Sequence, residues 1–221
     1  RLEKVSLRIP ENTITSLIGK NGSGKTTLFL IMMGYLKPIS GRIKLYLDGK
    51  YLPIDNSGGK IAFLPQRENF SKKNSVNDFL LLGRTPFINN FTQPSTKDYR
   101  KVEEVKNLLG IDHLGEKKIN KLSGGEFQIV RIGRTLAQEA DILIFDEPTS
   151  HLDISAKIKI FNLIRILKGL GKTILFSTHD PLDAFQIAEN SILIDREKGI
   201  RFGPTDKLLN DDNLSLCLGT I

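Results

Sequence analysis

The segment from Gly19 to Thr26 reads Gly-Lys-Asn-Gly-Ser-Gly-Lys-Thr, and it constrains the fold of this chain more than any other feature. Glycines let backbone N–H groups approach an anion closely, and a helix that begins beside them adds the partial positive charge of its N-terminus. The apolar run Thr13–Ile18 before the segment predicts a strand, and Leu28–Met33 after it predicts such a helix. This order is that of a phosphate-binding loop, or P-loop. We therefore predict an α/β fold with a mostly parallel sheet.

Two side chains at the end of the loop have the chemistry that a bound nucleotide requires. Lys25 would pair with the β- and γ-phosphates, and Thr26 would offer its hydroxyl to Mg²⁺. The rest of the loop would bind phosphate through its backbone. The predicted nucleotide-binding set is Gly19, Lys20, Asn21, Gly22, Ser23, Gly24, Lys25, Thr26 and Thr27.

A pair of acidic residues, Asp146 and Glu147, follows the apolar run Ile142–Phe145. That run does not alternate, as is typical of a strand covered on both faces. Neighbouring side chains at the end of a strand point to opposite sides. We predict that Asp146 binds Mg²⁺ and that Glu147 activates the water that attacks the γ-phosphate.

The segment Ser123-Gly124-Gly125-Glu126 opens another predicted helix, which runs to about Gln138. Serine followed three residues later by glutamate is a capping box. A plain helix start explains the serine and the glutamate, but it does not explain the two glycines, which cost helix stability. The glycines would leave the helix N-terminus open to an external anion.

Apolar patterns divide the remaining chain into two parts. Further strands are predicted at Val5–Ile9, Arg42–Leu47, Lys60–Leu64, Thr173–Ser177 and Ser191–Ile194, and a helix around Ile160–Leu167. The middle of the chain instead predicts helices at Val76–Leu82 and Tyr99–Leu109, with a loop over Gly83–Thr96 between them. We predict an α/β core from residues 1–67 and 139–221, and a helical subdomain from residues 68–138.

Composition excludes several classes of protein. The 221 residues carry 32 Lys and Arg against 25 Asp and Glu, a formal charge of +7, which we interpret as a solvated lysine-rich surface. The one cysteine, Cys217, cannot form an internal disulfide and is typical of a reducing compartment. No apolar run approaches the roughly 18 residues that span a bilayer. The chain lacks an initiator Met, and we expect that a strand upstream of Arg1 is missing.

The order and separation of these motifs resemble those of the ATP-binding cassette (ABC) ATPase family, over nearly the whole chain. Leu122–Glu126 matches the family's signature motif and Asp146–Thr149 its acidic motif. The resemblance implies a P-loop NTPase (RecA-like) core with an inserted α-helical subdomain. It also implies roles for Gln66, which would sense Mg²⁺ and the attacking water, and for His179, which would contact the γ-phosphate.

The resemblance further implies a mechanism and a set of partners. Two copies would sandwich two ATP molecules, each held by the P-loop of one copy and by Ser123–Glu126 of the other, with Asp153 in the loop that crosses the interface. The dimer would act on integral-membrane permease subunits at the cytoplasmic face of the cell membrane, and indirectly on a substrate-binding protein, with no nucleic acid expected. Family members stack adenine on an upstream aromatic residue, and none precedes Phe29 here.

The substrate and the alternative functions depend on shorter clues. The strings Leu82–Phe87 and Ser150–Ile154 are similar to those of importers for iron–siderophore, haem and cobalamin, so we predict import of an iron chelate or a similar metal complex. The alternative is a soluble ABC ATPase of DNA repair, translation or iron–sulfur assembly. The short segment 67–122 leaves no room for the long coiled coils of chromosome-type members. We assign no catalytic role to His151 and interpret His113 as a surface residue.

Overall fold

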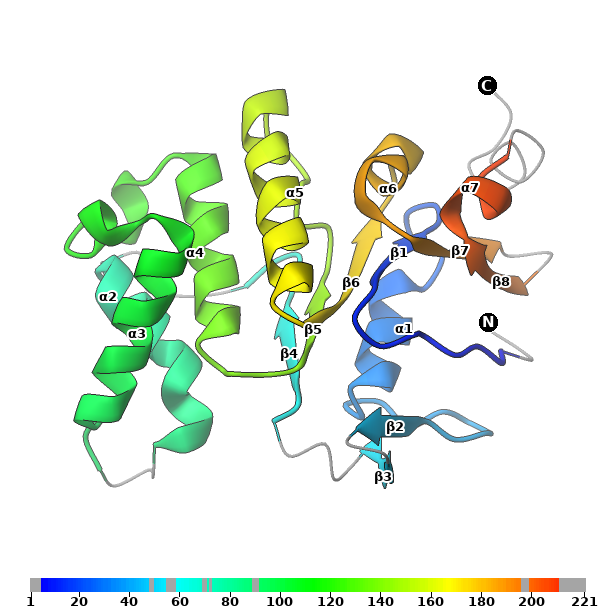
Figure 1. The fold of residues 1–221 in the computed structure, drawn as a ribbon, viewed down its shortest axis with the longest axis horizontal. Coiled ribbons are helices and arrows are strands. Elements are labelled where there is room, and N and C mark those ends of the chain that lie inside the picture. Colours follow the sequence, from blue (N-terminus) through cyan, green and yellow to red (C-terminus); the bar gives the residue numbers. More distant parts are fainter. Residues whose placement is uncertain are drawn as a thin grey trace.

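A mostly parallel sheet forms the centre of the molecule, with helices on both of its faces (Figure 1). The computed structural model describes residues 5–47, 50–54, 59–68, 71, 73–88, 92–195 and 199–210. Six strands of these residues pair in the order β4-β5-β6-β1-β7-β8, and only β8 runs antiparallel to its neighbour. The strands are β1 (Ile14–Ile18), β4 (Ile61–Leu64), β5 (Ile142–Phe145), β6 (Thr173–Thr178), β7 (Asn190–Asp195) and β8 (Gly199–Pro204). The predicted α/β fold class is confirmed.

Successive residues of the central strands pack into different cores. Leu143 and Phe145 of β5 pack with α5 (Ile154–Gly169), whereas Ile144 packs with α1 (Lys25–Met32) on the other face. This double coverage explains why β5 is apolar at every position. Two further helices, α6 (Pro181–Ile187) and α7 (Thr205–Leu208), complete this part of the chain.

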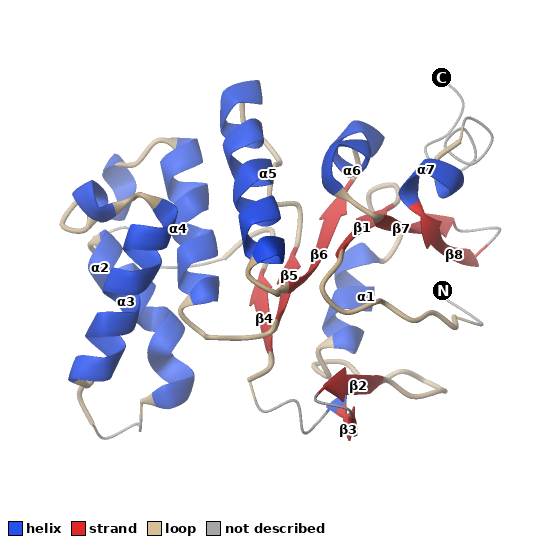
Figure 2. Cartoon of the chain, viewed as in Figure 1, coloured by secondary structure: helices blue, strands red, loops and turns tan. Residues whose placement is uncertain are grey.

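The middle of the chain forms a group of helices beside the sheet (Figure 2). Its described residues contain no strand, only an isolated bridge between Ser75 and Lys118. Serine and aspartate form capping boxes at the start of two of the helices, and Gly110 ends one of them in the left-handed conformation, with φ 65°. The elements are α2 (Val76–Leu81), η2 (Leu82–Phe87), α3 (Thr96–Leu109), η3 (Asp112–Leu114), η4 (Ile119–Lys121) and α4 (Gly124–Leu136).

Helix α4 contributes to two hydrophobic cores. Ile132 belongs to the core between the sheet and α5, and Val130 belongs to the core of the helical group. Gly133 lets the neighbouring helices approach closely, because a Cβ there would lie 2.8 Å from the side chains of both Leu80 and Leu109. The helical group and the sheet therefore share α4 as their common support.

A buried arginine holds the segment after α2 in place. Arg84 is 1% exposed, and its guanidinium donates to Asp98 at 3.0 Å, to Glu139 at 2.6 Å and to the carbonyl of Ala137 at 2.7 Å. At Gly83 a Cβ would lie 2.2 Å from the carbonyl oxygen of Arg134, so only glycine fits there. These contacts correct the prediction of a loop over Gly83–Thr96, because its first part is the 3₁₀ helix η2.

Two further predictions are corrected, and two strands were not predicted. Val5–Ile9 is not a strand: Leu7 and Ile9 pack against the core around Phe29, so their alternating burial needs no strand pairing. The helix predicted over Val76–Leu82 ends one residue earlier, at Leu81, and the side chain of Leu82 is 45% exposed. The sequence also did not reveal β8 or β3 (Lys50–Pro53), which pairs with β2 (Lys44–Leu47) as a separate hairpin.

Other expectations concern the surface and the C-terminal end of the chain. His113 is exposed, as predicted. The expectation for Cys217 lies outside the described residues. Within those residues, no helix combines the length and the apolar character that crossing a membrane requires.

The ion pair between Arg84 and Asp98 leads to a stability prediction. Hydrogen bonds from Ser95, assisted by Arg84, lower the pKa of Asp98 to about 2. Asp98→Asn should reduce the free energy of unfolding at pH 7 by roughly 2–4 kcal/mol, because the buried guanidinium loses a charged partner. Since the pKa is depressed on folding, this stabilisation is present above pH 3.8 and is lost as the pH falls towards 2.

Urea unfolding of both proteins between pH 7 and pH 2 measures this difference. Asp78→Asn is the matched control, because Asp78 caps α2 in the same way through Ser75 but has no buried arginine beside it. An Asp98→Asn loss equal to that of Asp78→Asn at pH 7 would contradict the account.

Candidate active site

Four neighbouring strands bring the predicted site residues to one edge of the sheet. β4, β5, β6 and β1 are parallel and adjacent, so their carboxyl ends meet at that edge, where ligands bind in open α/β sheets. The P-loop follows β1, and Gln66 follows β4. Asp146 and Glu147 follow β5, and His179 follows β6.

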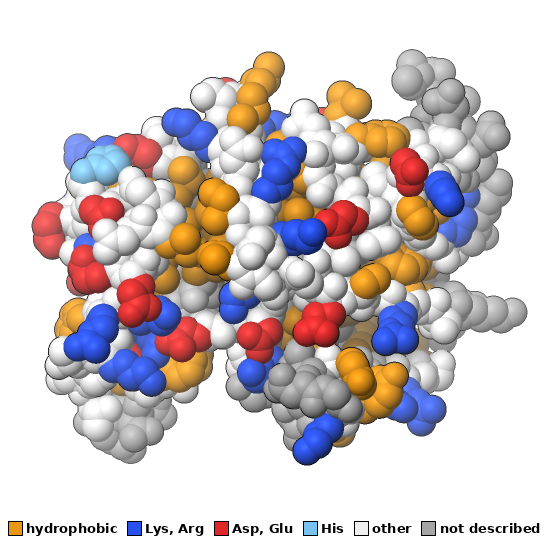
Figure 3. All heavy atoms as spheres, viewed as in Figure 1, with side chains coloured by type: hydrophobic (Ala, Val, Ile, Leu, Met, Phe, Trp, Pro, Cys, Tyr) orange, Lys and Arg blue, Asp and Glu red, His pale blue; other side chains and the backbone are white. Residues whose placement is uncertain are grey.

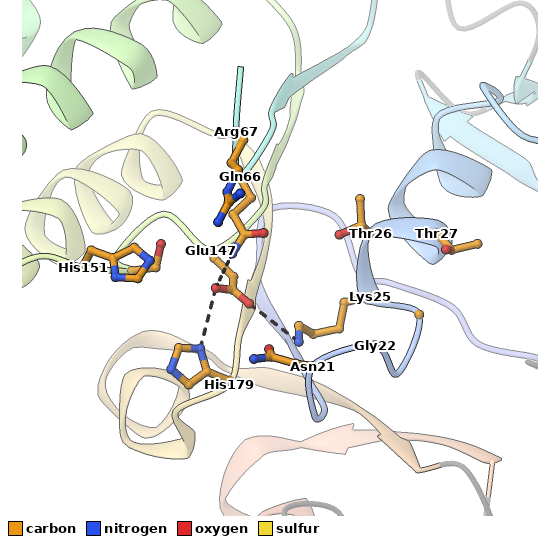
Figure 4. Close-up of a pocket in the computed structure, with 12 residues that line it drawn as sticks. Asn21, Gly22, Lys25, Thr26, Thr27, Gln66, Arg67, Glu147, His151 and His179 are labelled. Atoms are coloured by element: carbon orange, nitrogen blue, oxygen red, sulfur yellow. Dashed lines mark hydrogen bonds and ion pairs between the residues drawn. The ribbon is translucent and has the colours of Figure 1, made fainter. Parts of the chain in front are cut away.

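A cavity of about 740 Å³ lies at this edge, and all four segments line it (Figure 4). Glu147 lies near its centre, with Gln66, His179 and Lys25 pointing towards the carboxylate from different sides. Arg67 and His151 also line the cavity, although neither was predicted as a site residue. The remaining lining residues are Asn21, Gly22, Gly24, Thr26, Thr27 and Ser150.

The P-loop has the conformation that close approach to an anion requires. Gly22 and Gly24 have positive φ angles of 74° and 103°, which glycine adopts without strain. At Gly19 a Cβ would lie 2.6 Å from the hydroxyl of Ser23. That hydroxyl is buried and has no hydrogen-bond partner among the described residues, a state that buried polar groups rarely keep. A phosphate oxygen would satisfy it.

Lys25 is buried, and its ammonium group points back to the backbone of the P-loop. Its Nζ donates to the carbonyl of Gly19 at 2.9 Å and lies 3.7 Å from Oε1 of Glu147. Gly19, Lys20 and Ser23 belong to the loop but do not line the cavity. Lys25 thus places its charge beside the acidic pair.

The two acids point to different partners, as the end of a strand predicts. The hydroxyl of Thr26 donates to Oδ2 of Asp146 at 2.7 Å. Oε2 of Glu147 instead accepts a hydrogen bond from Nε2 of Gln66 at 2.8 Å and lies 3.7 Å from Nδ1 of His179. Asp146 therefore faces the start of α1, and Glu147 faces the centre of the cavity.

Ser177 holds both acids in these positions, and the sequence analysis missed it. It is fully buried on β6, the strand next to β5. Its hydroxyl donates to Oδ1 of Asp146 at 2.5 Å and accepts from the backbone N–H of Glu147 at 2.8 Å. Glu147 has a φ of 50°, which costs a non-glycine residue about 1–3 kcal/mol and persists only where surrounding contacts enforce it. No motif marks Ser177, because its role comes from strand pairing.

The remaining predicted residues do not reach the cavity within this chain. Ser123, Gly124, Gly125 and Glu126 begin α4, and Asp153 caps α5 by accepting from the N–H of Ala156 at 2.8 Å. The predicted capping box is present, and the backbone N–H of Ser123 lowers the pKa of the Glu126 carboxyl. Packing explains one of the paired glycines, since a Cβ on Gly125 would lie 3.1 Å from that of Ala156.

The contacts of Ser177 give a second stability prediction. Ser177→Ala should lower the free energy of unfolding by about 1.5–3 kcal/mol, because it removes a hydrogen bond to a carboxylate and leaves the N–H of Glu147 without its partner. Ser16→Ala is the control: Ser16 is equally buried on β1 but shares a neutral bond with Ser191, so about 0.5–1.5 kcal/mol should be lost. Equal losses in urea titrations of the two variants would contradict this ranking.

Comparison with known proteins agrees with the geometry. The family model described as ABC transporter matches residues 2–150. The molybdate import ATP-binding protein MolC of Haemophilus influenzae is 31% identical over 96% of this chain and 79% of its own length. The manganese transport ATP-binding protein MntA of Synechocystis is 32% identical, over 99% of this chain and 84% of that protein.

Solved structures show the same likeness. A chain from a structure assigned to the metal-chelate type of ABC transporter, in an inward-facing conformation, superposes with a TM-score of 0.87. It is 30% identical and covers 97% of this chain and 80% of its own. The family resemblance, the fold class and the transport function predicted from the sequence are therefore confirmed. This chain belongs to the ABC transporter family and is an ATP-binding, ATP-hydrolysing subunit.

Proposed function

We propose that the chain powers import of a metal or a metal chelate, working as a dimer with Mg²⁺-ATP at the cytoplasmic face of the cell membrane. The observation that carries the catalytic part is the position of Glu147, within reach of Lys25, Gln66 and His179 in one cavity. A carboxylate there can take a proton from a water that attacks a phosphate held by the loop.

The loop residues bind the triphosphate in this proposal. The hydroxyl of Ser23, which is buried and has no hydrogen-bond partner in the described part of the chain, favours phosphate binding, as does the backbone of Gly22 and Gly24. Lys25 gives up its bond to the carbonyl of Gly19 and pairs with the β- and γ-phosphates, where its charge stabilises the transferring group. The adjacent Asn21 and Thr27 line the same cavity and complete the phosphate contacts.

Thr26 and Asp146 fit a magnesium ion. Their oxygens lie 2.7 Å apart at the start of α1, and hydroxyl and carboxylate oxygens are ligands that Mg²⁺ accepts. The described residues contain no cluster of three His, Cys, Asp or Glu that could bind a metal without substrate. Mg²⁺ usually completes its shell with water and phosphate oxygens, and when bound it neutralises charge on the β- and γ-phosphates.

Gln66 and His179 assist Glu147 in the proposal. Gln66 donates to the carboxylate and so orients it, and its amide would also contact the attacking water and Mg²⁺. His179 is largely exposed, at 59%, and is free to turn its ring towards the γ-phosphate. Both follow strands that flank β5, so their distance from Glu147 is set by the sheet.

A second copy completes the site. Ser123 and Gly124 are exposed at the N-terminus of α4 and do not line the cavity of their own chain. The helix N-terminus carries partial positive charge and suits the γ-phosphate of an ATP bound to the other copy. Asp153, at the start of α5, lies in the loop that crosses between copies in this arrangement.

The transported substrate is inferred from the relatives. The names of the two relatives refer to molybdate and manganese, and the matched structure is of the metal-chelate type. A metal-containing substrate is common to them.

The exposed side chains of Leu82 and Phe87 support docking of a membrane permease on the helical group. Lys, Arg, Asp and Glu side chains are interspersed over the face in Figure 3, which does not favour a nucleic-acid surface there.

Glu147→Gln tests the catalytic proposal. The variant keeps the shape of the side chain but cannot accept a proton, so kcat should fall by about 10²–10⁴ while ATP still binds. Steady-state hydrolysis and equilibrium ATP binding measure the two quantities. Glu104→Gln, which changes an exposed carboxylate on α3, is the control. Wild-type turnover in Glu147→Gln would remove Glu147 from this role.

Affinity purification from native membranes in mild detergent tests the transport proposal. We expect a polytopic permease to co-purify with the chain, and Lys25→Ala to abolish uptake of one radiolabelled metal or metal chelate in the source cell. Recovery with ribosomes or nucleic acid and without a permease would contradict transport, although the ATPase assignment would stand.

A further inference from the structure

Two buried polar side chains of α4 lie one turn apart and connect segments that the catalytic proposal treats separately. Gln128 is 7% exposed and Arg131 is 8% exposed. Buried polar groups are costly unless every donor and acceptor is paired. Their partners therefore show what the pair holds in place.

Arg131 reaches the segment that carries Gln66. Its Nη2 donates to the carbonyl oxygen of Pro65, the residue immediately before Gln66. Its Nε donates to Glu68, two residues after Gln66, at 2.6 Å. Because the guanidinium is planar and rigid, these two bonds fix the position of the segment around Gln66 relative to α4.

Gln128 reaches the segment that carries Glu147. Nη1 of Arg131 donates to Oε1 of Gln128 at 2.8 Å, and Nε2 of Gln128 donates to the carbonyl of Pro148 at 2.7 Å. A guanidinium has donors only, so it dictates which way the amide of Gln128 points. The amide N–H must then face Pro148, the residue immediately after Glu147.

The contacts close into a ring. On the cavity side, Gln66 donates to Glu147 at 2.8 Å. On the other side, hydrogen bonds lead from Pro148 through Gln128 and Arg131 to Pro65, the residue before Gln66. The strained φ of Glu147, 50°, is consistent with a residue held from both sides. Ser177 holds its N–H, and Gln128 holds the carbonyl of the residue that follows.

We propose that Gln128 and Arg131 are positioning residues that set the place of the Glu147 carboxylate relative to Gln66. Neither touches nucleotide; they act through the backbone at Pro65 and Pro148. A movement of the Gln66 segment is thereby passed to the catalytic carboxylate through α4, the helix that begins with Ser123–Glu126. This inference rests on the roles proposed above for Gln66 and Glu147.

Gln128→Glu is the sharpest variant, because it keeps the shape and the acceptor that faces Arg131 but replaces the N–H donor with an oxygen opposite the carbonyl of Pro148. We expect kcat to fall by about 10–100-fold, since small misplacements of a reacting group cost that much. ATP affinity should change by less than about threefold, which separates positioning from lost binding.

A second pair of variants keeps the test decisive if Gln128→Glu folds poorly. Arg131→Lys retains the charge beside Glu68 but cannot hold Pro65 and Gln128 together, and it should also lower kcat by about 10-fold. Arg134→Lys is the matched control: Arg134 binds the same Glu68 at 2.5 Å but, within the part of the chain that the structure describes, does not bond to Pro65 or Gln128. It should stay within about twofold of wild type.

A double-mutant cycle with Gln66→Ala shows whether the effect passes through the ring. Gln128→Glu should cost less in kcat when Gln66 has already been removed, because both changes release the same carboxylate. Full additivity, or equal losses in Arg131→Lys and Arg134→Lys, would overturn the inference. Arrest of hydrolysis by Glu147→Gln combined with normal turnover in Gln128→Glu and Arg131→Lys would overturn the ring alone and leave the proposed function intact.

Discussion

Parallel pairing of four adjacent strands is the constraint on which the site depends. In the order β4-β5-β6-β1, each strand leads into one segment of the candidate site at the same edge: Gln66, the acidic pair, His179 and the P-loop. A slip of one residue in any register would turn the side chains of that strand to the opposite face. Burial of both faces of β5 prevents such a slip, because each of its side chains already fills a core. The hydrophobic cores thus determine where the charges lie.

The sheet brings the acidic pair to the edge, and hydrogen bonds then determine where each of the two carboxylates points. The hydroxyl of Ser177, on the neighbouring strand, holds the two acids in different positions. It accepts from the backbone N–H of Glu147 and donates to the carboxylate of Asp146. Thr26 then faces Asp146, and Gln66 faces Glu147. These neutral partners hold the two acids apart, as the roles proposed for Asp146 at Mg²⁺ and for Glu147 at the attacking water require. The hydrogen bond from the N–H of Glu147 to Ser177 also explains why Glu147 tolerates an unfavourable backbone conformation.

The sequence predicts those features that depend on local pattern. The P-loop, the capping box of α4, the Gly110 end of α3 and the unalternating β5 each follow from spacing and residue type. Resemblance to a family added Gln66 and His179, which as isolated polar residues carry no signal of their own.

Features that depend on tertiary contacts were missed. Arg84 is charged and lies in a segment rich in loop-forming residues, yet two carboxylates and a carbonyl make its burial favourable and turn the segment into η2. Ser177 and Gln128 look ordinary in sequence because their bonds to Asp146 and Pro148 span 31 and 20 residues. At Val5–Ile9 the sequence pattern predicted a strand that is not there. Leu7 and Ile9 are partly buried against the core, so the apolar alternation arises without strand pairing. Local propensity is a weak guide where long-range packing decides.

A structure of the Glu147→Gln protein with Mg²⁺-ATP tests the central claim most directly. The account predicts a dimer in which each triphosphate lies on Gly19–Thr26 of one copy, with its γ-phosphate between residue 147 and the Ser123–Glu126 helix start of the other. A triphosphate bound away from the ends of β1 and β5, or one enclosed fully by a single copy, would contradict it.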